Sequence, residues 1–262
     1  MATFNSATRC KWGATILIFT ALGIALADEG LNKIFAARAG AEFHRTQAEF
    51  QSDTNHSAIA LKFARACFDY ADFATNDAQH ASIAHQGIAA CRQLITHEPE
   101  SASAHYYLAM NLGQLARTET TGALKIVKEM EREFKTAAEL DGHLDYAGPE
   151  RGLGLLYRDA PGWPVSIGSR HKARQWLEQA EKLAPDYPEN HLNLAESHLQ
   201  WHNPSDAYRE LEALDALWPD AQTNLVGKAW ERSWDDWSTR CDTVRKRLNE
   251  MSKPMESSKN NR

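Results

Sequence analysis

The chain of 262 residues lacks the sequence features of most enzymes and of proteins that bind nucleic acids. It contains no nucleophile motif, no glycine-rich phosphate-binding loop and no pair of catalytic carboxylates. Gly152-Leu153-Gly154 follows helix-favouring residues and no predicted strand, which argues against a dinucleotide-binding loop. The net charge of −6 and the absence of a dense basic cluster argue against nucleic acid as the main partner. We therefore expect neither enzymatic activity nor a cofactor.

Glycine, proline and cysteine are also few, and their positions are informative. Glycine and proline concentrate in two predicted loops, 142–149 and 161–168. Cys67 and Cys91 fall on the two helices of one predicted hairpin, where they would form either a disulfide or two buried thiols. We favour buried thiols, because helical repeats pack well without covalent cross-links.

The amino terminus has the pattern of a signal peptide. Arg9 and Lys11 precede the mostly apolar run 12–27, and Ala25 and Ala27 place small residues at −3 and −1 of a cleavage point. This run is shorter than the ~20 residues that a membrane-spanning helix needs. We therefore expect cleavage after Ala27 and a periplasmic or secreted protein, with an uncleaved anchor as the alternative. No cysteine directly follows the run, which argues against a lipoprotein.

A repeat of 34 residues organises the rest of the chain. Its recurring positions hold small or apolar residues where two helices must touch, and proline where the second helix is expected to stop. The pairs are Ala173 and Ala207, Leu177 and Leu211, Ala180 and Leu214, and Pro185 and Pro219. Leu153, Gly154 and Tyr157 match the L-G-x-x-Y pattern, so the repeat resembles the tetratricopeptide (TPR) family.

An earlier copy of the repeat lies 86 residues before the last full copy. The matching residues are Pro99, His105, Leu108, Ala109 and Gln114 in the first copy, and Pro185, His191, Leu194, Ala195 and Gln200 in the second. Two periods account for less than this offset, which indicates an insertion of about 18 residues between the copies.

The resemblance implies an all-α, right-handed TPR-like solenoid of three to four helix-turn-helix repeats with a carboxy-terminal capping helix. The expected divisions are a signal peptide (1–27), an N-terminal helix and linker (28–54), the repeat domain (55–219), the capping helix (220–251) and a disordered tail (252–262). Within the first two-thirds of the chain we expect helices over 31–50, 57–73, 79–96, 102–116 and 121–140. We expect a further helix over 222–251 to carry Trp230, Trp234 and Trp237 on one face, as core residues in preference to a ligand-stacking platform.

Three histidines have the spacing of one helix face. His191, His198 and His202 fall at i, i+7 and i+11, which would suit a metal site. However, His191 and His105 both occupy the tryptophan position of the TPR pattern, where a flat side chain packs between helices. We favour packing over metal binding and expect no metal site.

Stacked repeats present the first helix of each pair on a concave face, where partners bind. The candidate binding residues on that face are Tyr106, Gln114, Arg151, Arg158, Glu189, Asn193, Glu196 and Gln200. Trp163, a large aromatic between Gly162 and Pro164, is the ninth candidate, because a stiff loop loses little entropy on binding. The alternative is that Trp163 packs into the core.

Tyr157-x-x-Ala-Pro-Gly-Trp163, with the run to Lys172-Ala173, resembles the T-component family of tripartite (TRAP-type) transporters. That family consists of periplasmic TPR proteins, so the resemblance implies a periplasmic solute-binding partner, a homo-oligomer that encloses a cavity, and a role in solute delivery. The first interpretation of function is a scaffold that binds a protein or peptide partner, and the alternative is a transporter accessory. An open polar groove favours the scaffold, whereas a closed cavity with apolar walls favours the accessory.

Overall fold

The computed structural model describes residues 29–119 and 122–252, which form ten α-helices. Their bounds are α1 (Glu29–Ser52), α2 (Ser57–Ala71), α3 (Asp77–His97), α4 (Ala102–Ala116), α5 (Ala123–Leu140), α6 (Gly148–Asp159), α7 (Arg170–Leu183), α8 (Pro188–Gln200), α9 (Pro204–Asn224) and α10 (Glu231–Ser252). The predicted signal peptide and nearly all of the predicted tail lie outside the described residues.

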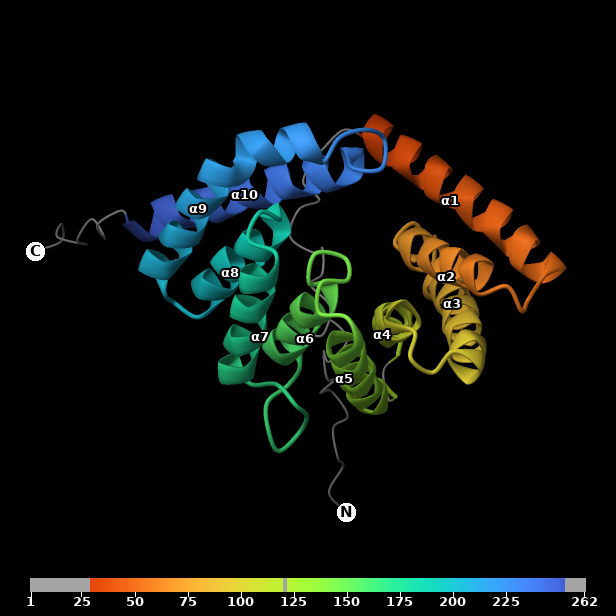
Figure 1. The fold of residues 1–262 in the computed structure, drawn as a ribbon. Helices are drawn as coiled ribbons and strands as arrows, with labels where there is room; N and C mark the ends of the chain where they lie inside the picture. The colour runs from red at the N-terminus through yellow and green to blue at the C-terminus, as the bar shows by residue number, and fades with distance from the viewer. Residues whose placement is uncertain (1–28, 120–121, 253–262) are drawn as a thin grey trace, which may run out of the picture.

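The helices pack in sequential pairs along an arc. α2 packs with α3, α4 with α5, α6 with α7 and α8 with α9, and the pairs follow one another in Figure 1. α1 packs against α2 at one end of the arc. This architecture confirms the predicted all-α repeat fold. No helix in the described part of the chain is both long enough and apolar enough to cross a membrane.

Glycine allows neighbouring helices to approach closely. A Cβ atom on Gly152 would lie 2.6 Å from the ring of Phe134, and one on Gly154 would lie 2.6 Å from Leu177 Cγ. Both distances are far shorter than a normal contact between carbon atoms. Ala173 is also fully buried at the contact between α6 and α7. The small residues of the repeat therefore mark the contacts between helices, as the pattern predicts.

The predicted boundaries of the first five helices differ from those observed by at most two residues. Local capping explains this agreement. The Asn76 side chain accepts a hydrogen bond from the Gln79 backbone N–H at the start of α3. Pro99 follows shortly after the end of α3, and Pro185 follows shortly after the end of α7.

The prediction that a helix stops at Pro219 is wrong. Pro219 lies inside α9, which continues to Asn224, whereas the pattern predicts that the helix stops there. Ala221 and Leu225 are buried in the carboxy-terminal core, so packing holds the chain helical for another turn despite the missing N–H of proline. As a result the capping helix begins later than predicted, and Trp230 precedes it.

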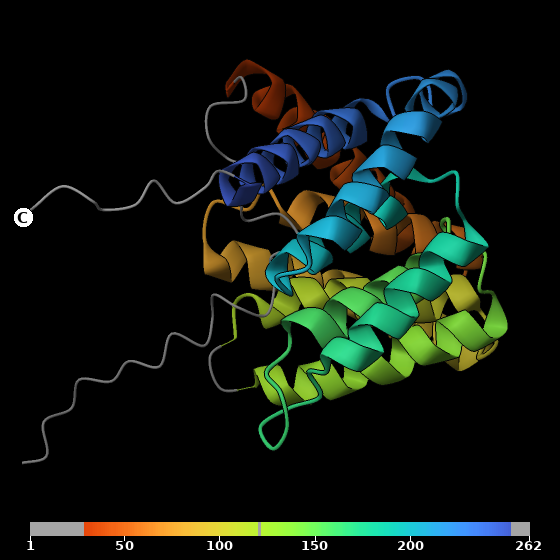
Figure 2. The same ribbon diagram turned by 90° about the vertical axis from the view of Figure 1, so that its left-hand side faces the viewer.

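α10 covers the last repeat and also reaches the start of the arc. Trp237 is 1% exposed, and the indole N–H of Trp234 donates to the Leu225 carbonyl at 2.7 Å, which confirms the core interpretation of these two residues. At the amino-terminal end of α10, Glu231 forms an ion pair with Arg38 of α1. Figure 1 shows the segment before α10 close to α1, and in Figure 2 both helices lie at the top of the molecule.

The cysteines of the predicted hairpin are free and buried. Cys67 lies on α2 and Cys91 on α3, and the structure has no disulfide between them. Burial raises the pKa of both thiols, because it disfavours the charged thiolate. They act as small core residues, as expected.

Replacing Gly154 tests the close helix contact. We expect Gly154→Val to lower the free energy of unfolding by about 3 kcal/mol, because the new side chain overlaps both Leu177 and its backbone. The measurement is chemical denaturation followed by circular dichroism. Gly162→Ala is the control, since a Cβ there would meet its nearest neighbour at 3.8 Å. Equal stability of the two variants would contradict this packing argument.

Candidate functional site

Most of the predicted binding residues contact other parts of their own chain. The residues engaged in this way are Tyr106, Gln114, Arg151, Arg158, Glu189, Asn193 and Glu196. Gln200 and Trp163 are exposed instead. The structure thus engages seven of the nine predicted residues in hydrogen bonds or ion pairs within the chain, and five of these seven belong to three structural units.

The first unit is a left-handed turn before α6. Asp145, Tyr146 and Ala147 have positive φ angles of 50°, 57° and 62°. Residues other than glycine adopt this conformation at an energetic cost, so neighbouring groups must hold it. The Tyr106 hydroxyl donates to Asp145 Oδ2 at 2.7 Å, and Arg151 donates to the carbonyl oxygens of Asp145 and Tyr146 at 3.2 and 3.0 Å. Tyr106 and Arg151 therefore position this turn.

Asn190 supports the same turn and was not predicted. Its side-chain nitrogen donates to the carbonyl oxygens of Tyr146, Ala180 and Ala184 at 3.2, 3.1 and 3.0 Å. Its side-chain oxygen accepts from Arg151 at 3.1 Å. Asn190 lies four residues before the buried Leu194, so helical spacing alone would have indicated a polar side chain at a buried position.

The second unit is an aromatic cluster beside the turn. Tyr146 stacks on Tyr187 with ring centroids 4.4 Å apart and an angle of 8° between the planes. Trp230 packs edge-on against both rings, at 5.9 and 6.2 Å. The guanidinium carbon of Arg151 lies 5.1 Å from the Tyr187 centroid. This cluster joins the turn before α6 to the segment before α10.

The third unit is centred on Arg240 of α10. It donates two hydrogen bonds of 2.8 Å to the carboxylate of Glu196 and one of 2.6 Å to Asn193 Oδ1. Asp236 and Glu189 lie 3.1 and 3.7 Å from the same guanidinium. Burial alone would raise the pKa of Glu196, but the charge and hydrogen bonds of Arg240 outweigh it and lower that pKa. α10 therefore covers the predicted binding residues of α8.

The guanidinium of Arg158 also forms its hydrogen bonds within the chain. It donates to both carboxylate oxygens of Asp159 at 2.7 and 2.9 Å, and to Ser197 Oγ at 3.3 Å. The side chains of this arginine and this aspartate are only 6% and 8% exposed. A buried pair of this kind fixes the position of α6 against α8 and is not open to a partner.

Trp163 lies away from these units. Its side chain is 88% exposed, so the alternative of a core tryptophan is wrong. The loop is closed by hydrogen bonds from Gly168 N to the Pro161 carbonyl at 2.9 Å and from Val165 N to the Gly162 carbonyl at 3.1 Å. In Figures 1 and 2 the α6–α7 loop projects from the side of the molecule opposite α10.

His105 and His191 each pack between helices and contact a proline carbonyl and a glutamate side chain. His105 contacts the Pro99 carbonyl at 2.9 Å and Glu133 at 2.6 Å, and His191 repeats this with the Pro185 carbonyl at 2.9 Å and Glu210 at 3.0 Å. This repetition explains why histidine replaces tryptophan at both positions. Among the described residues, no three potential ligands from His, Cys, Asp and Glu lie close enough to hold a metal ion.

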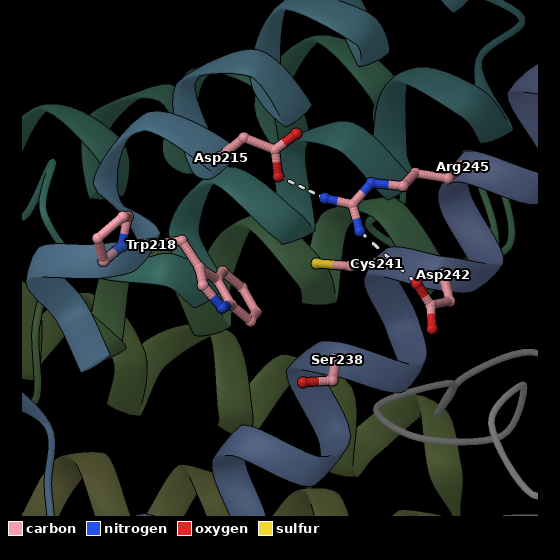
Figure 3. Close-up of a pocket in the computed structure, with 7 residues that line it drawn as sticks. Asp215, Trp218, Ser238, Cys241, Asp242 and Arg245 are labelled. Carbon is pink, nitrogen blue, oxygen red and sulfur yellow. Dashed lines mark hydrogen bonds and ion pairs between the residues drawn. The ribbon is translucent and has the colours of Figure 1, made fainter.

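A pocket lies between α9 and α10 (Figure 3). Arg245 forms an ion pair there with Asp215 and lies 3.6 Å from Asp242. The side chain of Cys241 lines the same pocket. Burial raises the pKa of Cys241 to about 11, which disfavours the nucleophilic thiolate form at neutral pH.

The fold is similar to that of a solved repeat protein. The crystal structure of TTC0263, a thermophilic TPR protein in Thermus thermophilus, matches this chain with a TM-score of 0.58 and 16% sequence identity. The match covers 82% of this chain and 94% of that chain. The chain has a TPR-like fold. At this sequence identity the match shows that the folds are similar, and it does not indicate a shared function.

The sequence comparisons cover less of the chain. The family model of regulator of microtubule dynamics protein 1-3 matches residues 31–145, which is under half of the chain. This segment runs from α1 to the left-handed turn. No curated protein matches the chain.

Replacing Arg240 tests the third unit. We expect Arg240→Met to lower the free energy of unfolding by about 3 kcal/mol, because it leaves the carboxylates of Glu196, Asp236 and Glu189 without their shared cation. The pKa of Glu196 is lowered in the folded state, so the advantage of the native chain should be full above about pH 5 and shrink as the pH falls below about 4. Denaturation at several pH values measures both effects.

Arg245→Met is the matched control on the same helix. Arg245 is 43% exposed and pairs with exposed carboxylates, so we expect its loss to cost under about 1 kcal/mol. Similar losses for the two variants would show that Arg240 is no more than a surface cation.

Proposed function

We propose that the protein is a non-enzymatic scaffold that binds a protein or peptide partner on the concave face of its arc. The observation that carries this proposal is the TPR-like stacking of helix pairs, which presents α2, α4, α6 and α8 side by side on one face. α10 covers the α8 end of this face, so the partner binds at the end formed by α2 and α4.

The polar groups at that end are accessible to a partner. The side chains of Arg65 and Asp69 on α2 are 65% and 47% exposed, and that of Asp145 is 40% exposed. Surrounding protein raises the pKa of Asp69 to about 6 by desolvation, although Arg65 lies nearby and opposes the change. A carboxylate in such a position gains from an added cation, which favours a partner with basic residues.

The alternative function is a periplasmic accessory of a TRAP-type transporter. Such a role would favour a closed cavity with apolar walls. The groups that cover the α8 end of this face are instead the ion pairs of Arg240 with Glu189, Glu196 and Asp236. A polar lining of this kind is better suited to a protein or peptide, so we rank the scaffold first.

We also propose that the protein is exported and cleaved after Ala27. The apolar run and the Ala25-x-Ala27 ending support this, and α1 begins at Glu29, so cleavage would leave every described helix intact. Mass spectrometry of the mature chain from the producing cell should give a mass that begins at Asp28. A chain that retains Met1 in a cytoplasmic fraction would rule out export.

The proposed scaffold function can be tested by affinity capture from the periplasm with this protein as the bait. Both the proteins and the small molecules that are captured should be identified. We expect Asp69→Lys to weaken capture of a protein partner, because it reverses the charge of the accessible carboxylate without removing a buried group. Lys228→Glu, an exposed charge reversal in the loop before α10, is the control. Capture of a small solute without a protein would favour the transporter alternative.

Trp163 is proposed as a second, separate contact. We expect Trp163→Ala to weaken partner capture by roughly 2 kcal/mol and to leave the melting temperature almost unchanged, since the side chain is 88% exposed. Tyr208→Ala, which removes another exposed aromatic side chain, controls for a general loss of apolar surface. Undiminished capture by the Trp163 variant would remove this loop from the binding surface.

A further inference from the structure

Arg232 of α10 is bound by residues from the other end of the chain. Its Nη2 donates to Asp72 Oδ2 at 2.8 Å, across 160 residues of sequence. Its guanidinium carbon also lies 4.7 Å from the centroid of the Phe73 ring. A charge-assisted hydrogen bond and a stacked aromatic ring are the two contacts by which proteins recognise arginine.

The carboxylate of Asp72 is oriented without help from α10. Its Oδ1 accepts from Gln114 Nε2 at 3.0 Å and from Arg117 Nη1 at 2.8 Å. Gln114 is itself held by His80 at 2.9 Å and by the Phe68 carbonyl at 3.2 Å. All these groups belong to α2, α3 and α4 or directly follow them. Oδ2 would therefore keep its position if Arg232 left.

The attachment of Arg232 is weak compared with that of the rest of α10. Later in the helix, Trp237, Cys241, Val244 and Leu248 are buried in the carboxy-terminal core. The Arg232 side chain is 40% exposed, and its neighbour Glu231 pairs with Arg38 where both side chains are nearly half exposed. The side chain of Asp72 is only 19% exposed, but the arginine side of the pair is open to solvent, so another arginine can compete for this place.

We propose that Asp72 and Phe73 form a binding site for an arginine side chain of a partner protein, and that Arg232 occupies this site until the partner displaces it. The proposal rests on the scaffold function above and specifies the chemistry of its partner. Trp230, two residues before Arg232, contacts the rings of Tyr146 and Tyr187, so the internal ligand has an aromatic-x-arginine pattern. A partner segment with the same pattern can fill both places.

The internal arginine weakens the apparent affinity for the partner. If Arg232 fills the site in about 90% of molecules, only about one molecule in ten is free to bind and the apparent Kd rises about tenfold. Removing Arg232 should therefore tighten binding, which distinguishes a displaceable ligand from a structural clamp. Lysine should bind less well than arginine, because it lacks the planar group that stacks on Phe73.

The probe is a fluorescent synthetic peptide with the sequence of residues 226–237, titrated into the full chain. We expect it to bind Arg232→Ala about tenfold more tightly than the native chain. In the Arg232→Ala background, Asp72→Asn should abolish this gain, and Phe73→Leu should reduce it by removing only the stacked ring. Peptides with lysine or alanine in place of the arginine should bind progressively less well.

Each other outcome overturns the proposal. Equal binding to the native chain and to Arg232→Ala, or binding that is insensitive to Asp72→Asn, would mean that the peptide binds elsewhere or not at all. Failure of Arg232→Ala to melt cooperatively would mean that Arg232 is a fixed structural clamp. Partner capture that survives Asp72→Asn while peptide binding is lost would reject this site and keep the scaffold. Failure of every variant to capture a protein would reject the scaffold itself.

Discussion

The close approach of neighbouring helices is the constraint on which the rest of the structure depends. Gly152 and Gly154 lie against Phe134 and Leu177 so closely that even a methyl group would overlap these side chains. The two helices on either side of α6 are therefore held at short range along one edge. Repetition of small residues at the other contacts carries this arrangement from pair to pair and produces the arc in Figure 1.

The inner face of the arc is organised by charge. Arg151 and Arg158 of α6 and Arg240 of α10 are each nearly buried, with a carboxylate or a row of carbonyl oxygens around the guanidinium. Breaking such a contact leaves an uncompensated charge, so these side chains fix the relative positions of α6, α8 and α10. The same contacts make much of the polar surface unavailable to a partner and leave the α2 and α4 end as the accessible part.

The sequence predicted the repeats and most helix boundaries because their causes are local. Asn76 caps α3, and Pro99 and Pro185 follow helices that end shortly before them. Pro219 misled the prediction, because the packing of Ala221 and Leu225 outweighs the local effect of proline. The internal partners of the candidate binding residues were not predictable, because they come from distant parts of the chain, as Arg240 does for Glu196. Nothing near Asp72 in the sequence indicates an arginine 160 residues away.

The contact between the two ends gives this repeat protein a mechanical property. In an open solenoid each repeat touches only its neighbours, so the arc can lengthen like a spring by small changes at every interface. Here α10 joins the last repeat to α1 and α2 through Glu231 and Arg232. While these contacts hold, lengthening the arc must also break the ion pairs of Glu231 and Arg232, and once they are lost only the interfaces between neighbouring repeats resist it.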